Sequence, residues 1–248
     1  MLTIDLNCDM GEGIGNEELI MPFISSANIA CGYHAGDEVS IWNTIELAIK
    51  HNVAIGAHVS FLDKANFGRS EFELPLNEVY ELVEQQLIII KEIADHFETP
   101  ANHVKPHGAL YNMSARQPKL ANVIAQAVLD FDHKLILYGL SGSFSISEAS
   151  SLGLHTANEV FADRRYDDEG KLIPRSNADA LIIDPDEAIL QITDIINKKI
   201  VTSSSRKEIP VLADTICIHG DGEKASLLAR NIYDHLKQAN IDIKAIQV

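Results

Sequence analysis

The stretch Leu2-Thr3-Ile4-Asp5-Leu6-Asn7-Cys8-Asp9 carries the pattern that decides the fold: a strand-like apolar run that ends in closely spaced polar residues. Asp5, Asn7 and Asp9 alternate, so they share one face if the strand continues that far. A strand-end array of this kind can bind a divalent cation through oxygen ligands or supply a general base that activates water. The alternative is that Asp9 and Glu12 only cap the following turn.

The same pattern recurs along the chain. Other apolar runs lead into Gly32-Tyr33-His34, His58, Lys105-Pro106-His107-Gly108, Asp163-Arg164-Arg165 and His219-Gly220-Asp221. The carboxyl ends of all strands lie on one side of a parallel sheet, so residues far apart in the sequence converge on one mouth. The arrangement is typical of an enzyme.

Strand-like runs rich in Ile, Val, Leu and Ala are predicted at 2–7, 27–31, 53–57, 102–105, 134–138, 156–161 and 213–218, with an eighth candidate at 241–247. Helical patterns lie between them at 39–51, 79–97, 116–130, 185–199 and 223–238, the last with Asp221 as its N-cap candidate. Strand alternating with helix predicts a parallel α/β sheet. Seven or eight units without a Gly, Ser or Pro linker favour a single (β/α) barrel domain over residues 1–248. The irregular stretches 59–77 and 164–180 are expected to cover the substrate.

Composition excludes several classes of partner. The chain of 248 residues carries a formal charge of -16, which would repel nucleic acid phosphates and an anionic membrane surface. No apolar run approaches the roughly 18 to 20 residues that a membrane span needs. Met1 is followed directly by the first strand, which leaves no room for a secretory signal, so a cytoplasmic location is expected.

The cysteines Cys8, Cys31 and Cys217 are odd in number and form no CxxC pair, which argues for a reducing compartment and against a disulfide framework. Buried thiols that pack the barrel rim are favoured over a zinc cluster. The alternative is a catalytic thiol at Cys31, three residues before His34.

Four histidines, His34, His58, His107 and His219, each follow a different strand and lie beside or near a glycine. A lone histidine is more often structural, but four at one barrel end indicate that two or three take part in function. No H-E-x-x-H motif is present, so a divalent metal site, with Asp9, His34 and His58 as candidate ligands, would have to be assembled across strands.

Lys105-Pro106-His107-Gly108-Ala109-Leu110-Tyr111 is the most specific segment. Its lysine ends an apolar run and can bind a carboxylate or steady an oxyanion, while His107 can move protons near neutral pH. A second strand end and the two long stretches supply further charged candidates, which are Glu159, Asp163, Arg164, Arg165, Arg175 and Arg69. Arginines can clamp a carboxylate or phosphate with two hydrogen bonds, although any one of them can instead be a surface ion pair.

Five segments, taken in order, resemble the LamB/YcsF family. They are Asp5-Leu6-Asn7-Cys8-Asp9-Met10-Gly11-Glu12, Asn28-Ile29-Ala30-Cys31-Gly32-Tyr33-His34-Ala35-Gly36-Asp37, Gly56-Ala57-His58, Lys105-Pro106-His107-Gly108-Ala109-Leu110-Tyr111 and Glu159-Val160-Phe161-Ala162-Asp163-Arg164. The resemblance implies an atypical seven-stranded TIM-like barrel of the glycoside hydrolase and deacetylase type. It also implies a role in opening 5-oxo-L-proline to L-glutamate, with ATP cleaved to ADP and phosphate and with PxpB-like and PxpC-like partner subunits. The chain lacks a G-x-x-x-x-G-K-[ST] loop, which agrees with ATP bound by those partners.

The chemistry of these side chains predicts a role for each candidate residue. The predicted catalytic residues are Asp9, Lys105, His107 and Asp163; the predicted substrate-binding residues are Asn7, Glu12, His34, His58, Glu159, Arg164 and Arg175. Within this scheme Lys105 and an arginine hold the carboxylate or phosphate, and Asp9 or His107 activates water. Two other functions stay open, a metal-dependent carbohydrate deacetylase or glycosidase and a regulatory subunit without catalytic activity. Assembly as a homo-oligomer is compatible with either.

Overall fold

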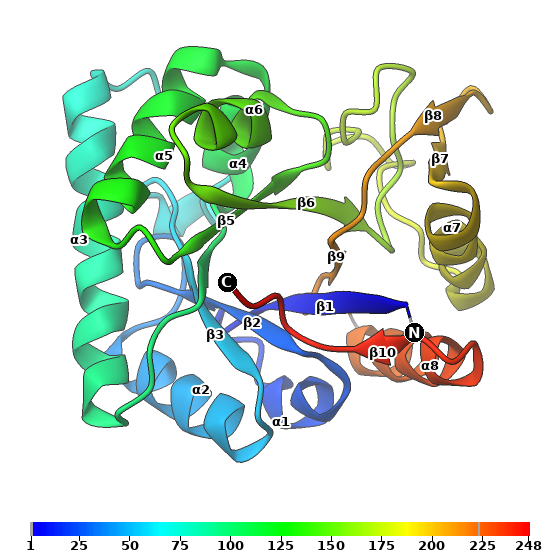
Figure 1. Cartoon of the computed structure of the whole chain (residues 1–248), viewed down its shortest axis with the longest axis horizontal. Coiled ribbons are helices and arrows are strands. Elements are labelled where there is room, and N and C mark those ends of the chain that lie inside the picture. Colours follow the sequence, from blue (N-terminus) through cyan, green and yellow to red (C-terminus); the bar gives the residue numbers. More distant parts are fainter. Residues whose placement is uncertain (1, 223) are drawn as a thin grey trace.

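A closed ring of parallel strands forms the centre of the molecule (Figure 1) in the computed structural model, which describes residues 2–222 and 224–248. The ring consists of β1 (Thr3–Met10), β2 (Ser26–Ala30), β3 (Ala54–His58), β4 (His103–Val104), β5 (Ile136–Leu140), β6 (His155–Phe161) and β9 (Thr215–Ile218). Neighbouring strands pair in parallel, and β9 pairs with both β6 and β1, which closes the barrel. The predicted seven-stranded α/β barrel is confirmed. The eighth candidate shrinks to β10 (Asp242–Ile243), which pairs with the start of β1.

Helices surround this ring and connect its strands (Figure 1). They are α1 (Glu17–Ile20), α2 (Glu38–Lys50), α3 (Leu76–His96), α4 (Gly108–Arg116), α5 (Pro118–Phe131), α6 (Phe144–Ser151), α7 (Pro185–Lys198) and α8 (Ala225–Gln238), with 3-10 turns at Met21–Phe23 and Lys64–Asn66. α2 begins with a capping box, because Asp37 accepts from the Ser40 N–H and the Ser40 hydroxyl accepts from the Asp37 N–H. In the part of the chain described, no helix is both long enough and apolar enough to cross a membrane.

Several sequence predictions of local structure need correction. The short helices α4 and α6 and the antiparallel pair β7 (Ile200–Thr202) and β8 (Glu208–Pro210) are absent from the predicted elements. Each is short, and α6 is rich in serine, a residue with only moderate helix propensity. Asp221 is not the N-cap of α8, whose N-cap is Lys224, because the Asp221 carboxylate pairs with arginines instead.

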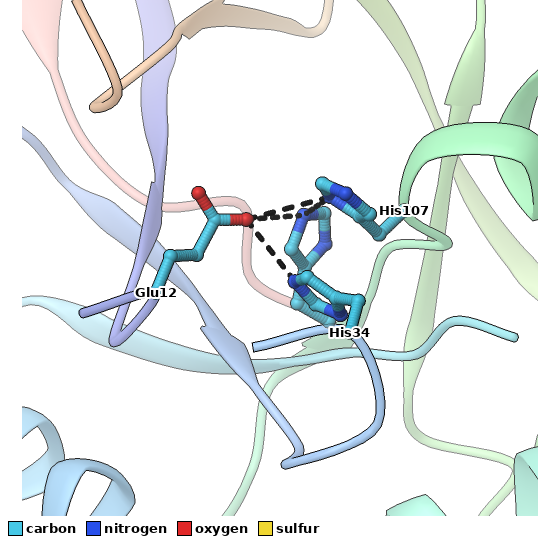
Figure 2. Close-up of side chains that lie close together, drawn as sticks. Glu12, His34 and His107 are labelled. Carbon is cyan, nitrogen blue, oxygen red and sulfur yellow. Dashed lines mark hydrogen bonds and ion pairs between the residues drawn. The ribbon is translucent and has the colours of Figure 1, made fainter. Parts of the chain in front are cut away.

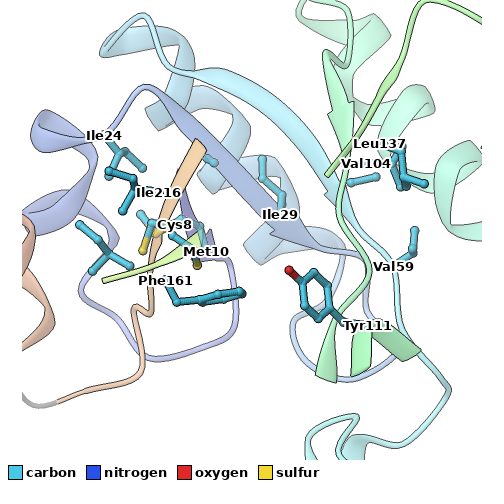
Figure 3. Close-up of a cluster of buried hydrophobic side chains, with 14 of the residues drawn as sticks. Cys8, Met10, Ile24, Ile29, Val59, Val104, Tyr111, Leu137, Phe161 and Ile216 are labelled. Carbon is cyan, nitrogen blue, oxygen red and sulfur yellow. The ribbon is translucent and has the colours of Figure 1, made fainter. Parts of the chain in front are cut away.

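The side chains of β1 alternate between two buried environments, the apolar core between the strands and the helices and the polar inside of the barrel. Even-numbered residues such as Leu6 and Cys8 pack outward with Ile29 and Ile216 in the apolar core between the strands and the helices, part of which is seen in Figure 3. Asp5, Asn7 and Asp9 are buried as well, but they bind polar side chains of other strands. The predicted shared face of these residues is therefore the inside of the barrel.

Polar side chains fill the inside of the barrel in layers. At the amino-terminal end, Asp5 accepts hydrogen bonds from the hydroxyls of Ser25, Ser26, Tyr138 and Thr215 at 2.6 to 3.0 Å. In the next layer the Asn28 amide donates to Asn7 Oδ1 at 2.7 Å, and His103 Nε2 lies 2.8 Å from Asn28 Oδ1. The third layer contains Asp9 and Lys105 and opens towards the carboxyl ends of the strands. Barrels of this type are usually filled by branched apolar side chains, so this column is a distinguishing feature of the chain.

Candidate active site

A cavity of about 610 Å³ lies at the carboxyl ends of the strands. Residues of both long irregular stretches form part of its wall, including Phe67, Arg69 and Arg175. The predicted site residues that line it are Asp9, Glu12, His58, Lys105, His107, Arg164 and Arg175; Asn7, His34, Glu159 and Asp163 lie behind the lining. The first long stretch ends two residues earlier than predicted, because α3 begins at Leu76.

Lys105 sits at the floor of the cavity in a buried ion cluster. Its Nζ donates to Asp9 Oδ1 at 2.9 Å, to Asn7 Oδ1 at 3.3 Å and to Cys217 Sγ at 3.1 Å. Burial favours the neutral amine, but Asp9, Cys217 and Glu159 together raise the pKa of Lys105 well above its usual value. Lys105 is therefore an ammonium ion whose three N–H groups are used within the protein. Its geometry suits positioning of Asp9 better than capture of a substrate carboxylate.

Glu159 is the second carboxylate beside this lysine. Its Oε1 lies 2.9 Å from Lys105 Nζ, but the two groups are not aligned as a hydrogen bond, and neither carboxylate oxygen has a hydrogen-bond partner among the described residues. The side chain is fully buried. A buried carboxylate without hydrogen bonds destabilises the folded state. The positive charge of Lys105 offsets this cost for Glu159.

Asp9 links this ion cluster to the histidines. Its Oδ1 accepts from the Asn28 amide at 2.8 Å, and its Oδ2 lies 3.3 Å from His58 Nε2. Burial opposes ionisation of Asp9, yet the neighbouring His58 and Lys105 outweigh it and hold the pKa of this carboxyl well below its usual range. Asp9 is an ionised carboxylate at the cavity floor, and it does not cap a turn.

Glu12 and three of the four predicted histidines form a second cluster beside Asp9. Figure 2 shows Glu12 facing His34 and His107. Glu12 Oε1 lies 3.1 Å from His34 Nε2, 3.4 Å from His107 Nδ1 and 3.8 Å from His58 Nε2. Burial, followed by the charges of Asp9 and Asp221, raises the pKa of Glu12 well above its usual value. Burial, with the neighbouring His58, lowers the pKa of His34 to about 2. The sequence prediction that these histidines converge is confirmed by the geometry.

The fourth histidine, His219, lines another wall of the cavity and pairs with Asp163 behind it. Its Nδ1 lies 2.8 Å from Asp163 Oδ1, and its backbone N–H donates to Asp163 Oδ2 at 3.0 Å. Burial opposes ionisation of Asp163, but His219 outweighs it and lowers the pKa of the carboxyl. Asp163 thus holds the proton on Nδ1, which leaves Nε2 of His219 as the basic nitrogen. This pairing resembles the base and orienting group of many hydrolases.

Tyr111 adds a donor to the same wall. Its hydroxyl is buried beside the Glu159 carboxylate without a well-aligned hydrogen bond among the described residues, and the side chain lines the cavity. Burial, followed by the charge of Glu159, raises the pKa of Tyr111 well above its usual value, so the group is a neutral phenol. Its ring meets the edge of Phe161 at 5.8 Å, and Phe161 stacks on His219 at 5.4 Å (Figure 3 shows Tyr111 and Phe161).

The predicted arginines divide into two groups. Arg69 Nη2 and Arg175 Nη1 lie 3.0 and 2.6 Å from the same oxygen of Asp221, at the mouth of the cavity. Arg164 is buried and donates to the carbonyls of Ile173 and Ala180, so it holds the second long stretch in place. Arg165 pairs with Glu187 and does not line the cavity.

No catalytic or substrate-binding role was predicted for His219, Tyr111 or Asp221, although His219 was one of the four candidate histidines and Asp221 was predicted to cap the last helix. His219-Gly220-Asp221 was visible as a polar cluster after a strand, but its partner Asp163 lies 56 residues away, and nothing in the spacing indicates that pairing. The catalytic-thiol alternative for Cys31 finds no support, because this thiol is buried, contacts the Ile29 carbonyl and has a pKa raised by burial. All three cysteines are buried and free, as the prediction of packing thiols expects.

A cavity at the carboxyl ends of a closed parallel barrel, lined by a histidine that pairs with an aspartate behind it, is the arrangement of barrel enzymes. Residues 4–248 match the LamB/YcsF family, and the chain belongs to that family. It is 48% identical to the A subunit of 5-oxoprolinase from Staphylococcus aureus (strain Newman), over 99% of this chain and 100% of the relative.

Two solved structures superpose on the whole barrel. The lactam utilization protein from Thermus thermophilus superposes with a TM-score of 0.92 at 38% identity and covers 99% of this chain and 100% of that one. A family 4 carbohydrate esterase from Streptomyces lividans superposes with a TM-score of 0.55 at 9% identity, over 99% of this chain and 93% of that one. This second likeness concerns the fold alone.

Proposed function

We propose that this chain is the ring-opening subunit of a cytoplasmic, ATP-dependent 5-oxoprolinase, which hydrolyses the cyclic amide of 5-oxo-L-proline to L-glutamate. The substrate is proposed from the full-length similarity to the A subunit of 5-oxoprolinase and to a lactam utilization protein. One observation supports the reaction class: His219 lines the cavity and is paired with Asp163 behind it. ATP would be bound and cleaved by PxpB-like and PxpC-like partners.

In this proposal His219 takes a proton from the attacking water. Asp163 accepts the Nδ1–H of His219, fixes the ring and stabilises the imidazolium that forms. His107, predicted as an alternative base, has Nδ1 against His58 and Nε2 against the Phe67 carbonyl, so neither nitrogen is available to water. The same proton can then pass from His219 to the departing ring nitrogen.

The remaining groups bind the substrate and its developing charge. Arg175 and Arg69 would bind the carboxylate of 5-oxoproline at the mouth of the cavity. The Tyr111 hydroxyl, which lies beside Glu159 without a well-aligned hydrogen bond, would turn to donate to the carbonyl oxygen as negative charge develops there. Asp9 and Lys105 would supply a fixed field at the cavity floor, and Asn7 and Glu159 would position that pair.

Glutamate formation from 5-oxoproline and ATP tests the proposal. The chain alone, the partner subunits alone and their mixture are compared, and glutamate is expected only from the mixture. His219→Ala and Asp163→Asn should lower the rate by about 10²- to 10⁴-fold, the usual contribution of general acid–base catalysis. His155→Ala, at an exposed position on β6, is the matched control and should retain full activity. Full activity of His219→Ala would remove the base assignment, and absence of glutamate from the mixture would refute the proposed reaction.

A further inference from the structure

We propose that Glu12, His34, His58 and His107 form a binding site for a divalent transition metal ion of the zinc class. One oxygen of Glu12 and one ring nitrogen from each histidine all lie within 4.8 Å of one another, and all four side chains are buried. They come from four separate segments of the chain, at or just after the carboxyl ends of strands, and Figure 2 shows His34 and His107 turned towards Glu12.

The outer nitrogen of each ring faces a hydrogen-bond acceptor. His58 Nδ1 lies 2.9 Å from the Lys105 carbonyl, and His107 Nε2 lies 3.0 Å from the Phe67 carbonyl. A carbonyl oxygen only accepts, so both of these ring nitrogens carry hydrogen. His34 Nδ1 lies 2.9 Å from Ser60 Oγ. That hydroxyl already donates to the Phe61 carbonyl, so it accepts from His34.

These hydrogen bonds leave a lone pair on the inner nitrogen of each neutral ring. When both rings are neutral, His58 Nε2 and His107 Nδ1 face each other at 2.8 Å as two lone pairs, and His34 Nε2 faces Glu12 Oε1 at 3.1 Å. Two lone pairs at such a distance repel unless a cation lies between them. The arrangement is that of metal-binding histidines, which donate their other N–H to a carbonyl or another acceptor behind the ring.

The donor types select the class of ion. Three imidazole nitrogens and one carboxylate oxygen suit zinc and the neighbouring transition metals, whereas magnesium and calcium prefer oxygen ligands. Ligand atoms about 2.0 Å from a tetrahedral ion lie about 3.3 Å apart. Four of the six separations among the inner atoms, 2.8, 3.1, 3.4 and 3.8 Å, bracket that value, and all six are within 4.8 Å.

A supporting residue further from the site strengthens the interpretation. The Gln86 side chain of α3 accepts from the Ser60 N–H at 2.9 Å and donates to the Ser60 carbonyl at 3.0 Å, and it is fully buried. Gln86 therefore fixes Ser60, which in turn fixes the His34 ring. Of the ligands predicted from sequence, His34 and His58 belong to this set, while Asp9 lies beside it and pairs with Lys105.

The test measures metal binding by the whole purified chain without substrate, ATP or partners, so its outcome is independent of the proposed oxoprolinase activity. Chelator-treated protein is titrated with Co²⁺, whose visible absorption reports the coordination geometry, and bound Co²⁺ is then displaced with Zn²⁺. One equivalent is expected to bind, with an absorption spectrum of nitrogen and oxygen ligation.

Variants decide which residues hold the ion. Ser60→Ala should weaken binding by about 10- to 100-fold, as loss of a supporting hydrogen bond does at metal sites. His34→Gln and His107→Gln, each checked for folding by circular dichroism, should weaken it further. His219→Ala, which alters the other histidine of the cavity, should bind as the wild type does. Failure of the wild type to bind one equivalent, or equal binding by the His34 and His107 variants, would overturn the proposal.

Discussion

The imidazole of His103 occupies the space that Gly56 leaves open, and a Cβ atom on Gly56 would lie 2.1 Å from His103 Nε2. The ring cannot easily move away, because it stacks on Tyr138 at 4.2 Å and binds Asn28 at 2.8 Å. Asn28 in turn donates to Asp9. The space left by Gly56 on β3 is thus linked to Asp9 at the cavity floor through the buried contacts of His103 and Asn28.

Gly56→Ala should therefore destabilise the protein by about 1–3 kcal/mol, the usual cost of overpacking a core. Urea denaturation measures the change. In a His103→Ala background the clash is absent, so the penalty of Gly56→Ala should largely disappear in a double-mutant cycle. A penalty of equal size in both backgrounds would contradict the steric explanation.

Lys105→Met should be strongly destabilising. It removes the cation and leaves Asp9 and Glu159 as buried carboxylates, and breaking a buried pair in this way costs about 3–5 kcal/mol. Lys105→Met combined with Glu159→Gln should recover part of the loss, because one of the two uncompensated charges is then gone. Equal stability of the wild type and Lys105→Met would show that the lysine does not neutralise this cluster.

Much of this architecture follows from the sequence, because alternation and strand ends are local patterns. Asp5, Asn7 and Asp9 do share one face, and the histidines after β2, β3 and β4 do meet. Boundaries shifted where a local interaction decides them: β5 starts at Ile136 rather than at 134, since a turn that includes the Lys134 N–H bound to Asp132 precedes it.

The spacing of residues along the sequence did not predict which side chains of distant strands contact one another. Lys105 was predicted to bind a substrate anion, yet its ammonium is used by Asp9, Asn7 and Cys217, which come from β1 and β9. The choice of Asp163 as the partner of His219 depends on β6 and β9 being neighbours in the barrel. Such contacts form because the ring of strands closes. The sequence predicts the closed barrel but not which side chains meet inside it.

Asp5 should make stability depend on pH in a defined direction. Burial raises the pKa of Asp5 above its ordinary value despite four hydroxyl donors, so the folded state binds this proton more tightly than the unfolded chain does. Stability contributed by the protonated carboxyl is present below the unfolded pKa of about 3.9 and is lost as pH rises through the folded pKa.

Asp5→Asn lacks this titration and serves as the reference. The free energy of unfolding of the wild type minus that of Asp5→Asn, measured by urea denaturation at several pH values from about 4 upward, should fall as pH rises. A difference that grows with pH would indicate instead that the four hydroxyl donors outweigh burial and lower the pKa of Asp5 in the folded state.

Asp221 should compete with an anionic substrate for two arginines. Arg69 and Arg175 share its Oδ2 atom at the mouth of the cavity, so Asp221→Asn removes their common anionic partner and leaves both guanidinium groups for an incoming carboxylate. If the chain acts on 5-oxoproline, the KM of the reconstituted enzyme should fall by up to about tenfold, equivalent to about 1.4 kcal/mol. Arg175→Ala should raise it while changing kcat little, because it removes binding common to substrate and transition state. The effect of Asp221→Asn should shrink as salt is added, since these charges are partly exposed. A KM that rises in Asp221→Asn would show that the carboxylate orients the arginines and does not compete for them.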